Sequence, residues 1–161
     1  MKFRISLALV VACSVLSNGC SKTKTGQPAP AGGQANSAAT PAEHAHGSGP
    51  NGGVVFDFGS HHAEFTVDHG KKECTIVVLG DDEKTPVAVS ASELMLNTNE
   101  TKTAEGTAVP PMTITMKPAD PADGKATKFA GSDPGLGNVA DFAGTVSGEV
   151  DGKPSQGEFK E

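Results

Sequence analysis

Apolar and polar residues alternate along the chain from Gly53 onward, and the alternation is clearest over residues 61–68. On one side of an extended segment lie Ala63, Phe65 and Val67, and on the other lie His62, Glu64, Thr66 and Asp68. This pattern predicts a β-strand with one buried apolar face and one exposed polar face.

Further short apolar stretches predict more strands, separated by residues that favour turns. A turn over residues 68–72 leads into a more buried strand, residues 73–79, in which Cys74, Ile76 and Val78 share a face. The other predicted strands are residues 54–58, 86–89, 94–97, 112–117, 128–130, 142–150 and 156–160. The last two meet at Asp151-Gly152, a pair that favours a tight hairpin turn.

No segment has the periodicity of a long helix. Ser90–Leu94 has the form of a helix capping box, which allows a single helical turn there, but we predict strand from Leu94. Short strands with frequent turns predict an all-β fold, a single antiparallel β-sandwich for which an immunoglobulin-like layout is one arrangement.

The first residues of the chain have the form of a bacterial export signal. Lys2 and Arg4 precede an apolar run from Ile5 to Leu16, which is shorter than the ~20 residues that a membrane-spanning helix needs. We therefore predict that residues 1–19 are a signal peptide.

The end of this signal, Ser17-Asn18-Gly19-Cys20, resembles the lipobox of bacterial lipoproteins, in which a cysteine is acylated before cleavage. The resemblance implies a lipid on Cys20 that anchors the protein to a membrane of the cell envelope. Ser17 stands where the lipobox usually has Leu. A second match that ends at Cys13, and ordinary cleavage that leaves Cys20 free, are the alternatives.

The next segment, residues 20–49, contains almost no large apolar residue and consists mostly of Gly, Pro, Ala, Ser, Thr, Gln and Asn. Such a segment buries too little apolar surface to offset the entropy that ordering costs. We predict a disordered, lipid-anchored tether over residues 20–49 and one β-sandwich domain over residues 50–161.

Charge and composition exclude several kinds of partner. Removal of the signal peptide deletes Lys2 and Arg4, which leaves 11 basic and 19 acidic side chains and a net charge of −8. An acidic chain without basic clusters, and without Trp or Tyr for base stacking, is not expected to bind nucleic acid. Cys74 has no cysteine partner in the domain and is predicted to be an inert core thiol.

No motif of an enzyme is present. The chain lacks a Gly-x-Ser-x-Gly nucleophile elbow, a Cys-x-x-Cys pair and a phosphate-binding loop before a helix. We therefore predict that the protein is not an enzyme and has no catalytic residues.

Histidines form the one cluster of chemically active residues. The chain has five, and His44 and His46 lie on one side of an extended segment, as do His62 and Glu64. Imidazole nitrogen and carboxylate oxygen together suit Cu²⁺ or Zn²⁺. The predicted metal ligands are His62, Glu64, His44, His46 and His69, with Asp57 and Asp68 nearby in sequence. The alternative is a solvated hairpin that carries His, Asp and Glu without binding metal.

The stretch from His46 to Asp68, followed by a Thr-Pro-Val strand, is similar to small secreted bacterial domains found alone or beside periplasmic adaptor subunits of heavy-metal efflux pumps. The similarity covers residues 46–89 and, more loosely, the last hairpin. Its motif matches Gly49, Pro50, Gly52, Gly53, His62 and Glu64. The resemblance implies a periplasmic or surface domain associated with metal handling and without enzymatic activity.

These observations predict a cell-envelope lipoprotein whose domain acts as a binding module for Cu or Zn. The predicted partners are the membrane, through the lipid, and envelope or efflux proteins. The alternative function is an envelope module that recognises another protein and binds no metal.

Overall fold

The structure, a computed structural model, describes residues 46–161. Its strands are β1 (Val54–Phe58), β2 (His61–Asp68), β3 (Glu73–Leu79), β4 (Leu94–Thr98), β5 (Thr101–Lys102), β6 (Ala108–Val109), β7 (Thr113–Pro118), β8 (Lys128–Ser132), β9 (Ala143–Val150) and β10 (Lys153–Lys160), and one 3-10 helix, η1, spans Pro134–Gly137. Within this part of the chain no helix is long and apolar enough to span a membrane. Cys20 and His44 lie outside the described residues.

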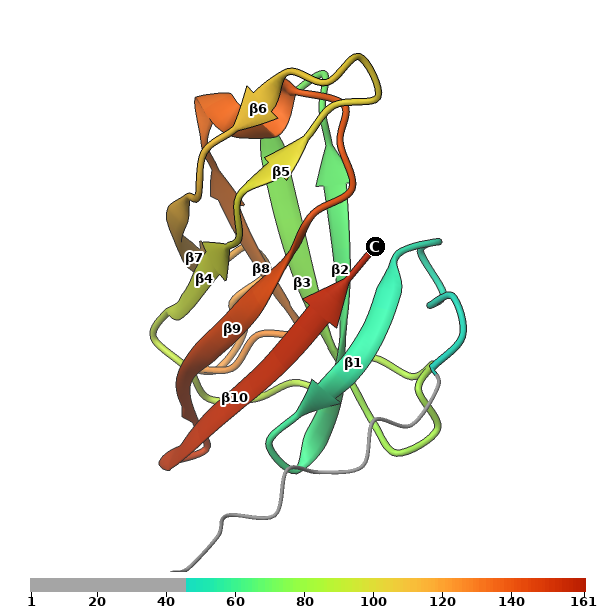
Figure 1. Cartoon of the computed structure of the whole chain (residues 1–161). Coiled ribbons are helices and arrows are strands. Elements are labelled where there is room, and N and C mark those ends of the chain that lie inside the picture. Colours follow the sequence, from blue (N-terminus) through green and yellow to red (C-terminus); the bar gives the residue numbers. More distant parts are fainter. Residues whose placement is uncertain (1–45) are drawn as a thin grey trace, which may run out of the picture. The chain divides into compact units, whose positions relative to one another are not determined.

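Eight of the strands form one antiparallel sheet that is nearly closed into a barrel-like sandwich (Figure 1). Their order is β1-β2-β3-β8-β7-β4-β9-β10, and the two edge strands, β1 and β10, lie side by side. The strands β5 and β6 form a separate short hairpin. The predicted all-β antiparallel sandwich is therefore confirmed.

Close contact between β1 and β10 depends on a glycine. A Cβ atom on Gly157 would lie only 2.1 Å from the backbone oxygen of Asp57, so a larger residue would push the two strands apart. Phe159 of β10 stacks on Phe65 of β2, with ring centroids 4.3 Å apart. It also contacts the ring of Phe56 in β1, at 5.9 Å. Aromatic packing thus closes the sheet beside this glycine.

The interior contains the apolar side chains that the alternation predicts. Ala63 and Phe65 of β2 are fully buried, as expected. All the phenylalanines of the described chain are buried as well: Phe56, Phe58, Phe65, Phe129, Phe142 and Phe159. Each such side chain contributes about 1.5–3 kcal/mol by leaving water.

The hairpin of β9 and β10 confirms the turn predicted at Asp151-Gly152. Both residues have positive φ, 49° and 74°, which a two-residue turn of this kind requires. Val150 and Lys153 pair directly across it. The strand predicted from Leu94 is also present, as β4.

Two short regions differ from the prediction. Pro86 and Val89 form isolated bridges, to Leu79 and Ala126, and not the regular strand expected over residues 86–89. Pro86 has no N–H to donate, which interrupts a ladder at that position. The β5–β6 hairpin is not predicted, because strands of two residues are too short to show alternation.

Candidate metal site

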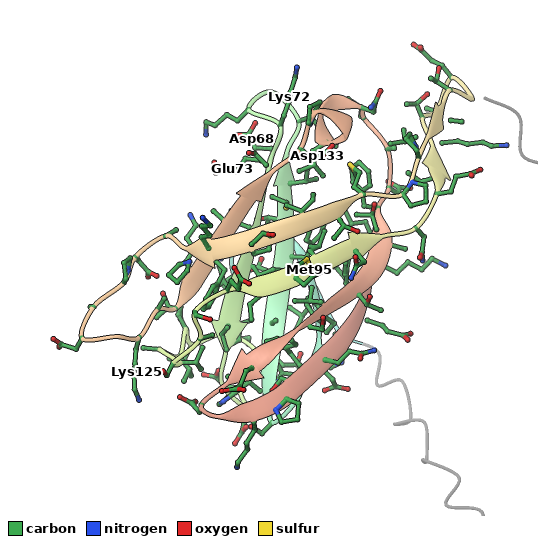
Figure 2. The ribbon with its side chains drawn as sticks, turned by 90° about the vertical axis from the view of Figure 1, so that its left-hand side faces the viewer. Asp68, Lys72, Glu73, Met95, Lys125 and Asp133 are labelled. Atoms are coloured by element: carbon green, nitrogen blue, oxygen red, sulfur yellow. The ribbon has the colours of Figure 1, made fainter. Side chains whose placement is uncertain are left out.

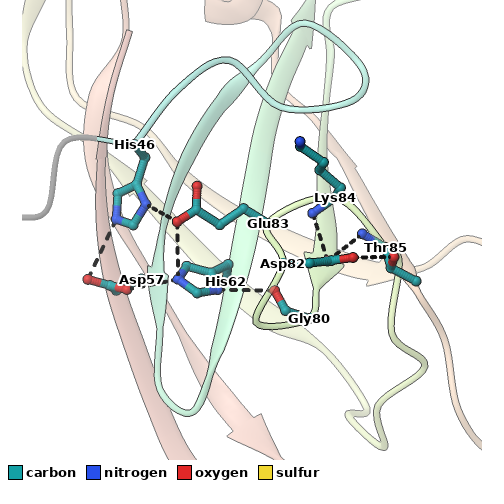
Figure 3. Close-up of polar contacts among 8 residues, drawn as sticks. All are labelled: His46, Asp57, His62, Gly80, Asp82, Glu83, Lys84 and Thr85. Carbon is teal, nitrogen blue, oxygen red and sulfur yellow. Dashed lines mark hydrogen bonds and ion pairs between the residues drawn. The ribbon is translucent and has the colours of Figure 1, made fainter.

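Two histidines and two carboxylates meet near the turn between β1 and β2 (Figure 3). His62 lies in β2, and Asp57 is its direct partner in β1. His62 also pairs with Leu79, the last residue of β3. The chain therefore leaves β3 beside this imidazole, and Glu83 in the loop that follows contacts it. His46 comes from the segment that precedes β1.

Three of these residues have donor atoms close enough to share one ion. The Nδ1 atom of His46 lies 3.1 Å from Oε1 of Glu83, and the Nε2 atom of His62 lies 3.7 Å from the same oxygen. One donor atom of each residue lies within 4.8 Å of the other two. Ligands at tetrahedral angles and 2.0–2.1 Å from a metal are roughly 3.3 Å apart, which is close to both of these separations.

Asp57 contacts both imidazoles from the other side. Its Oδ1 atom lies 3.4 Å from Nε2 of His62, and its Oδ2 atom lies 3.6 Å from Nε2 of His46. His46 therefore faces a carboxylate with each ring nitrogen. Asp57 does not belong to the compact set of His46, His62 and Glu83, and its position suits a group that orients an imidazole.

The ring of His62 is oriented by the backbone. Its Nδ1 atom lies 3.1 Å from the carbonyl oxygen of Gly80. A carbonyl only accepts hydrogen bonds, so Nδ1–H donates, and the neutral ring presents the lone pair of Nε2 to Glu83. Hydrogen bonds to the second nitrogen commonly fix metal-binding histidines in this way.

A tight loop after β3 positions Glu83. The backbone N–H of Glu83 donates to Gly80, and that of Gly80 donates to Thr85. Asp82 accepts hydrogen bonds from the hydroxyl and N–H of Thr85 and from the N–H of Lys84, and these bonds lower the pKa of Asp82 to about 2. Glu83 itself has a φ of 58°, which is uncommon for a residue other than glycine.

Histidines are the ion-pair partners of both carboxylates in the described part of the chain. Across residues 46–161, Asp57 and Glu83 form ion pairs with imidazoles and none with Lys or Arg. The side chains of His46 and His62 are 11% and 19% exposed, whereas those of Glu83 and Asp57 are 38% and 47% exposed. A cation can thus reach the site from water and would balance its negative charge.

Glu64 is not part of this site, and the prediction that it lies on an exposed face is wrong. Its side chain is fully buried. The carboxylate accepts hydrogen bonds from the N–H groups of Asn51 and Gly53, at 2.8 and 2.9 Å, and from the Asn51 side chain at 2.7 Å. Gly49 packs so closely on it that a Cβ there would lie 2.4 Å from the carboxyl carbon. Glu64 therefore attaches the segment before β1 to the sheet.

His69 also lies away from the site, in the turn at the other end of β2. Seven residues of extended chain separate it from His62, which is a distance of roughly 23 Å. The Nδ1–H group of His69 donates to the backbone oxygen of Leu136, at 2.8 Å. Asp68 is paired with Lys71, at 2.9 Å. Four of the five predicted ligands lie in the described part of the chain, and the structure brings two of these together, His46 and His62.

Glu83 is the member of the set that was not among the predicted ligands. The signal for it was the register of the predicted hairpin. A turn over residues 68–72 places His62 opposite Leu79, so the acidic residues that follow Leu79 must lie near His62.

Comparison of the chain with known protein families, with characterised proteins and with solved structures gives no match. The similarity to domains of heavy-metal efflux systems therefore stays a prediction.

Proposed function

We propose that this protein binds one divalent transition metal ion, Cu²⁺ or Zn²⁺, through His46, His62 and Glu83. The proposal depends on one observation, the approach of two imidazoles and a carboxylate to within 4.8 Å of one another. Both ions accept nitrogen and oxygen ligands of this kind. The bond from His62 to Gly80 and the contact of Asp57 with His46 supply the orienting groups that such ligands usually have.

The amino-terminal sequence supports a location for this binding module in the cell envelope. In this proposal residues 1–19 direct export, a lipid on Cys20 anchors the protein to a membrane, and the domain binds its ion outside the cytoplasm without catalysing a reaction. Envelope or efflux proteins that handle the same ion would be its partners.

Calorimetric titration of the purified, metal-free protein with Cu²⁺, Zn²⁺ and Mg²⁺ tests the proposal. We expect one equivalent of Cu²⁺ to bind, Zn²⁺ to bind more weakly and Mg²⁺ not to bind, because imidazole favours the first two ions and Cu²⁺ most of all. Absence of heat with both Cu²⁺ and Zn²⁺ would instead favour the alternative, a module that recognises another protein.

A further inference from the structure

The three ligands of the proposed site do not complete a coordination shell. His46, His62 and Glu83 supply three donor atoms, whereas structural zinc sites use four protein ligands. Asp57 lies outside this set. Its Oδ2 atom contacts the ring nitrogen of His46 that does not face Glu83, and its Oδ1 atom lies 3.4 Å from Nε2 of His62. A bound tetrahedral ion would therefore have one position left for water or for an external ligand.

That fourth position can be reached from solvent. The two imidazoles are mostly covered, but Glu83 is the most exposed of the three ligands and Asp57 beside it is more exposed still. In Figure 3 the two carboxylates approach the imidazoles from different segments, β1 and the loop after β3. An approaching donor group would meet the ion beside Glu83, the most exposed of the three ligands.

We infer that this site passes its ion to an acceptor protein by direct ligand exchange and does not retain it as a structural ion. This inference rests on the proposed function. An imidazole or carboxylate of the acceptor first bonds to the ion at the open position and displaces the water there, and further acceptor ligands replace the protein's own as each bond breaks. The bond from the ion to Oε1 of Glu83 then breaks, and the bonds to the two imidazoles break last. The charge of the ion does not change, so no oxidant or reductant takes part.

The order of these steps can be tested by the kinetics of metal transfer. The protein is loaded with one equivalent of Zn²⁺ and mixed in a stopped-flow instrument with the chelator 4-(2-pyridylazo)resorcinol, which changes colour when it binds zinc. If the chelator bonds to the ion before the protein releases it, the transfer rate rises in proportion to chelator concentration. A rate that is independent of chelator concentration would mean that the ion leaves first, and it would overturn the inference while the proposed function stands.

A second measurement uses an external anion. Azide added to the protein loaded with Cu²⁺ should produce a new charge-transfer band in the visible spectrum and shift the electron paramagnetic resonance spectrum, because it occupies the open position. An unchanged spectrum at saturating azide would show a closed site. A protein that binds neither Cu²⁺ nor Zn²⁺ would instead overturn the proposed function itself.

Asp57→Asn is the matched control for both experiments. Asp57 orients an imidazole and is not one of the three ligands, so the variant should bind Zn²⁺ about 10–100-fold more weakly, as is usual for outer-shell partners. Transfer from it should still depend on chelator concentration. Loss of this dependence in Asp57→Asn would show that Asp57 takes part in the exchange and that the assigned open position is wrong.

Discussion

The two ends of β2 contain the same kinds of residue in different electrostatic surroundings. At the first end, His62 lies among Asp57, Glu83 and a second imidazole, and no lysine or arginine of residues 46–161 pairs with the two carboxylates. At the second end, Asp68 is already paired with Lys71, and the ring of His69 is bonded to the backbone of Leu136.

Figure 2 shows this second end, where Asp68, Glu73 and Asp133 gather with Lys72 beside η1. The ring of His69 also packs near Phe142, with centroids 6.2 Å apart, so its role there is to connect the turn to the core. The comparison teaches that a group of His, Asp and Glu suits a metal only where its charges and lone pairs lack other partners.

The largest expected effect comes from Phe65→Ala, in the middle of β2, because both ends depend on this strand. Phe65 is fully buried and stacks on Phe159. Urea denaturation should show a loss of ~3–5 kcal/mol in the free energy of unfolding, the usual cost of such a cavity. Val139→Ala is the control, since Val139 is 70% exposed and should change stability little. An equal, small effect of both substitutions would contradict the packing described above.

The next effect should come from Glu64→Ala, which affects only the first end. It removes the charged acceptor of the hydrogen bonds from the N–H groups of Asn51 and Gly53, and a hydrogen bond to a charged group contributes about 1.5–3 kcal/mol. The variant should lose stability by about that amount and should also bind metal more weakly, because His46 begins the same segment. Glu158→Ala removes an exposed carboxylate and is the control. Metal binding equal to that of the control would show that His46 does not depend on Glu64.

His62→Ala and His69→Ala compare the two ends directly. Without His62 the proposed site loses a ligand, so titration should show at least tenfold weaker Cu²⁺ binding, which is about 1.4 kcal/mol or more. Without His69 the affinity should stay the same, while the free energy of unfolding falls by about 0.5–1.5 kcal/mol for the lost hydrogen bond. If the two variants lose affinity equally, the distinction between the two ends is wrong.

The smallest effect on stability at neutral pH is expected from ionisation of the Cys74 thiol. Cysteine is a residue type that binds metals, and Cys74 lies near the second end of β2. Burial raises the pKa of its thiol to about 12, so the thiol is neutral and unreactive in the folded protein. Ellman's reagent at pH 8 should react only after unfolding. Because the unfolded thiol ionises near pH 9, the free energy of unfolding should fall between pH 9 and about 12, and more steeply than in Cys74→Ala. Rapid reaction of the native protein would contradict the assigned burial.

Much of the fold could be predicted from the sequence because burial and alternation coincide in most strands. The faces of β2 and the β9–β10 turn follow from neighbouring residues alone. Glu64 could not be placed correctly, because alternation shows which residues share a face but not what covers that face. Here residues 49–53 cover the outer face of β2 and supply the donors that make a buried carboxylate stable.

The site was also predictable in part, because some of its contacts follow from local pairing and others depend on tertiary structure. His62 and Asp57 are paired across one hairpin, so sequence distance already places them together. Glu83 and His46 reach them through the pairing of β3 and the path of the segment before β1, which are tertiary features. The separation of His69 from His62 follows from strand length, since β2 is eight residues long and His69 comes directly after it.

The contact between β1 and β10 also has a consequence for how the protein is made. A ribosome delivers β1 before β10, yet Phe159 must pack on Phe65 before the sheet is closed. Contacts between residues so far apart in sequence form slowly, since a long loop must close first. The sheet therefore stays open until β10 emerges. Premature termination near residue 150 would leave the aromatic core open to water and to proteases.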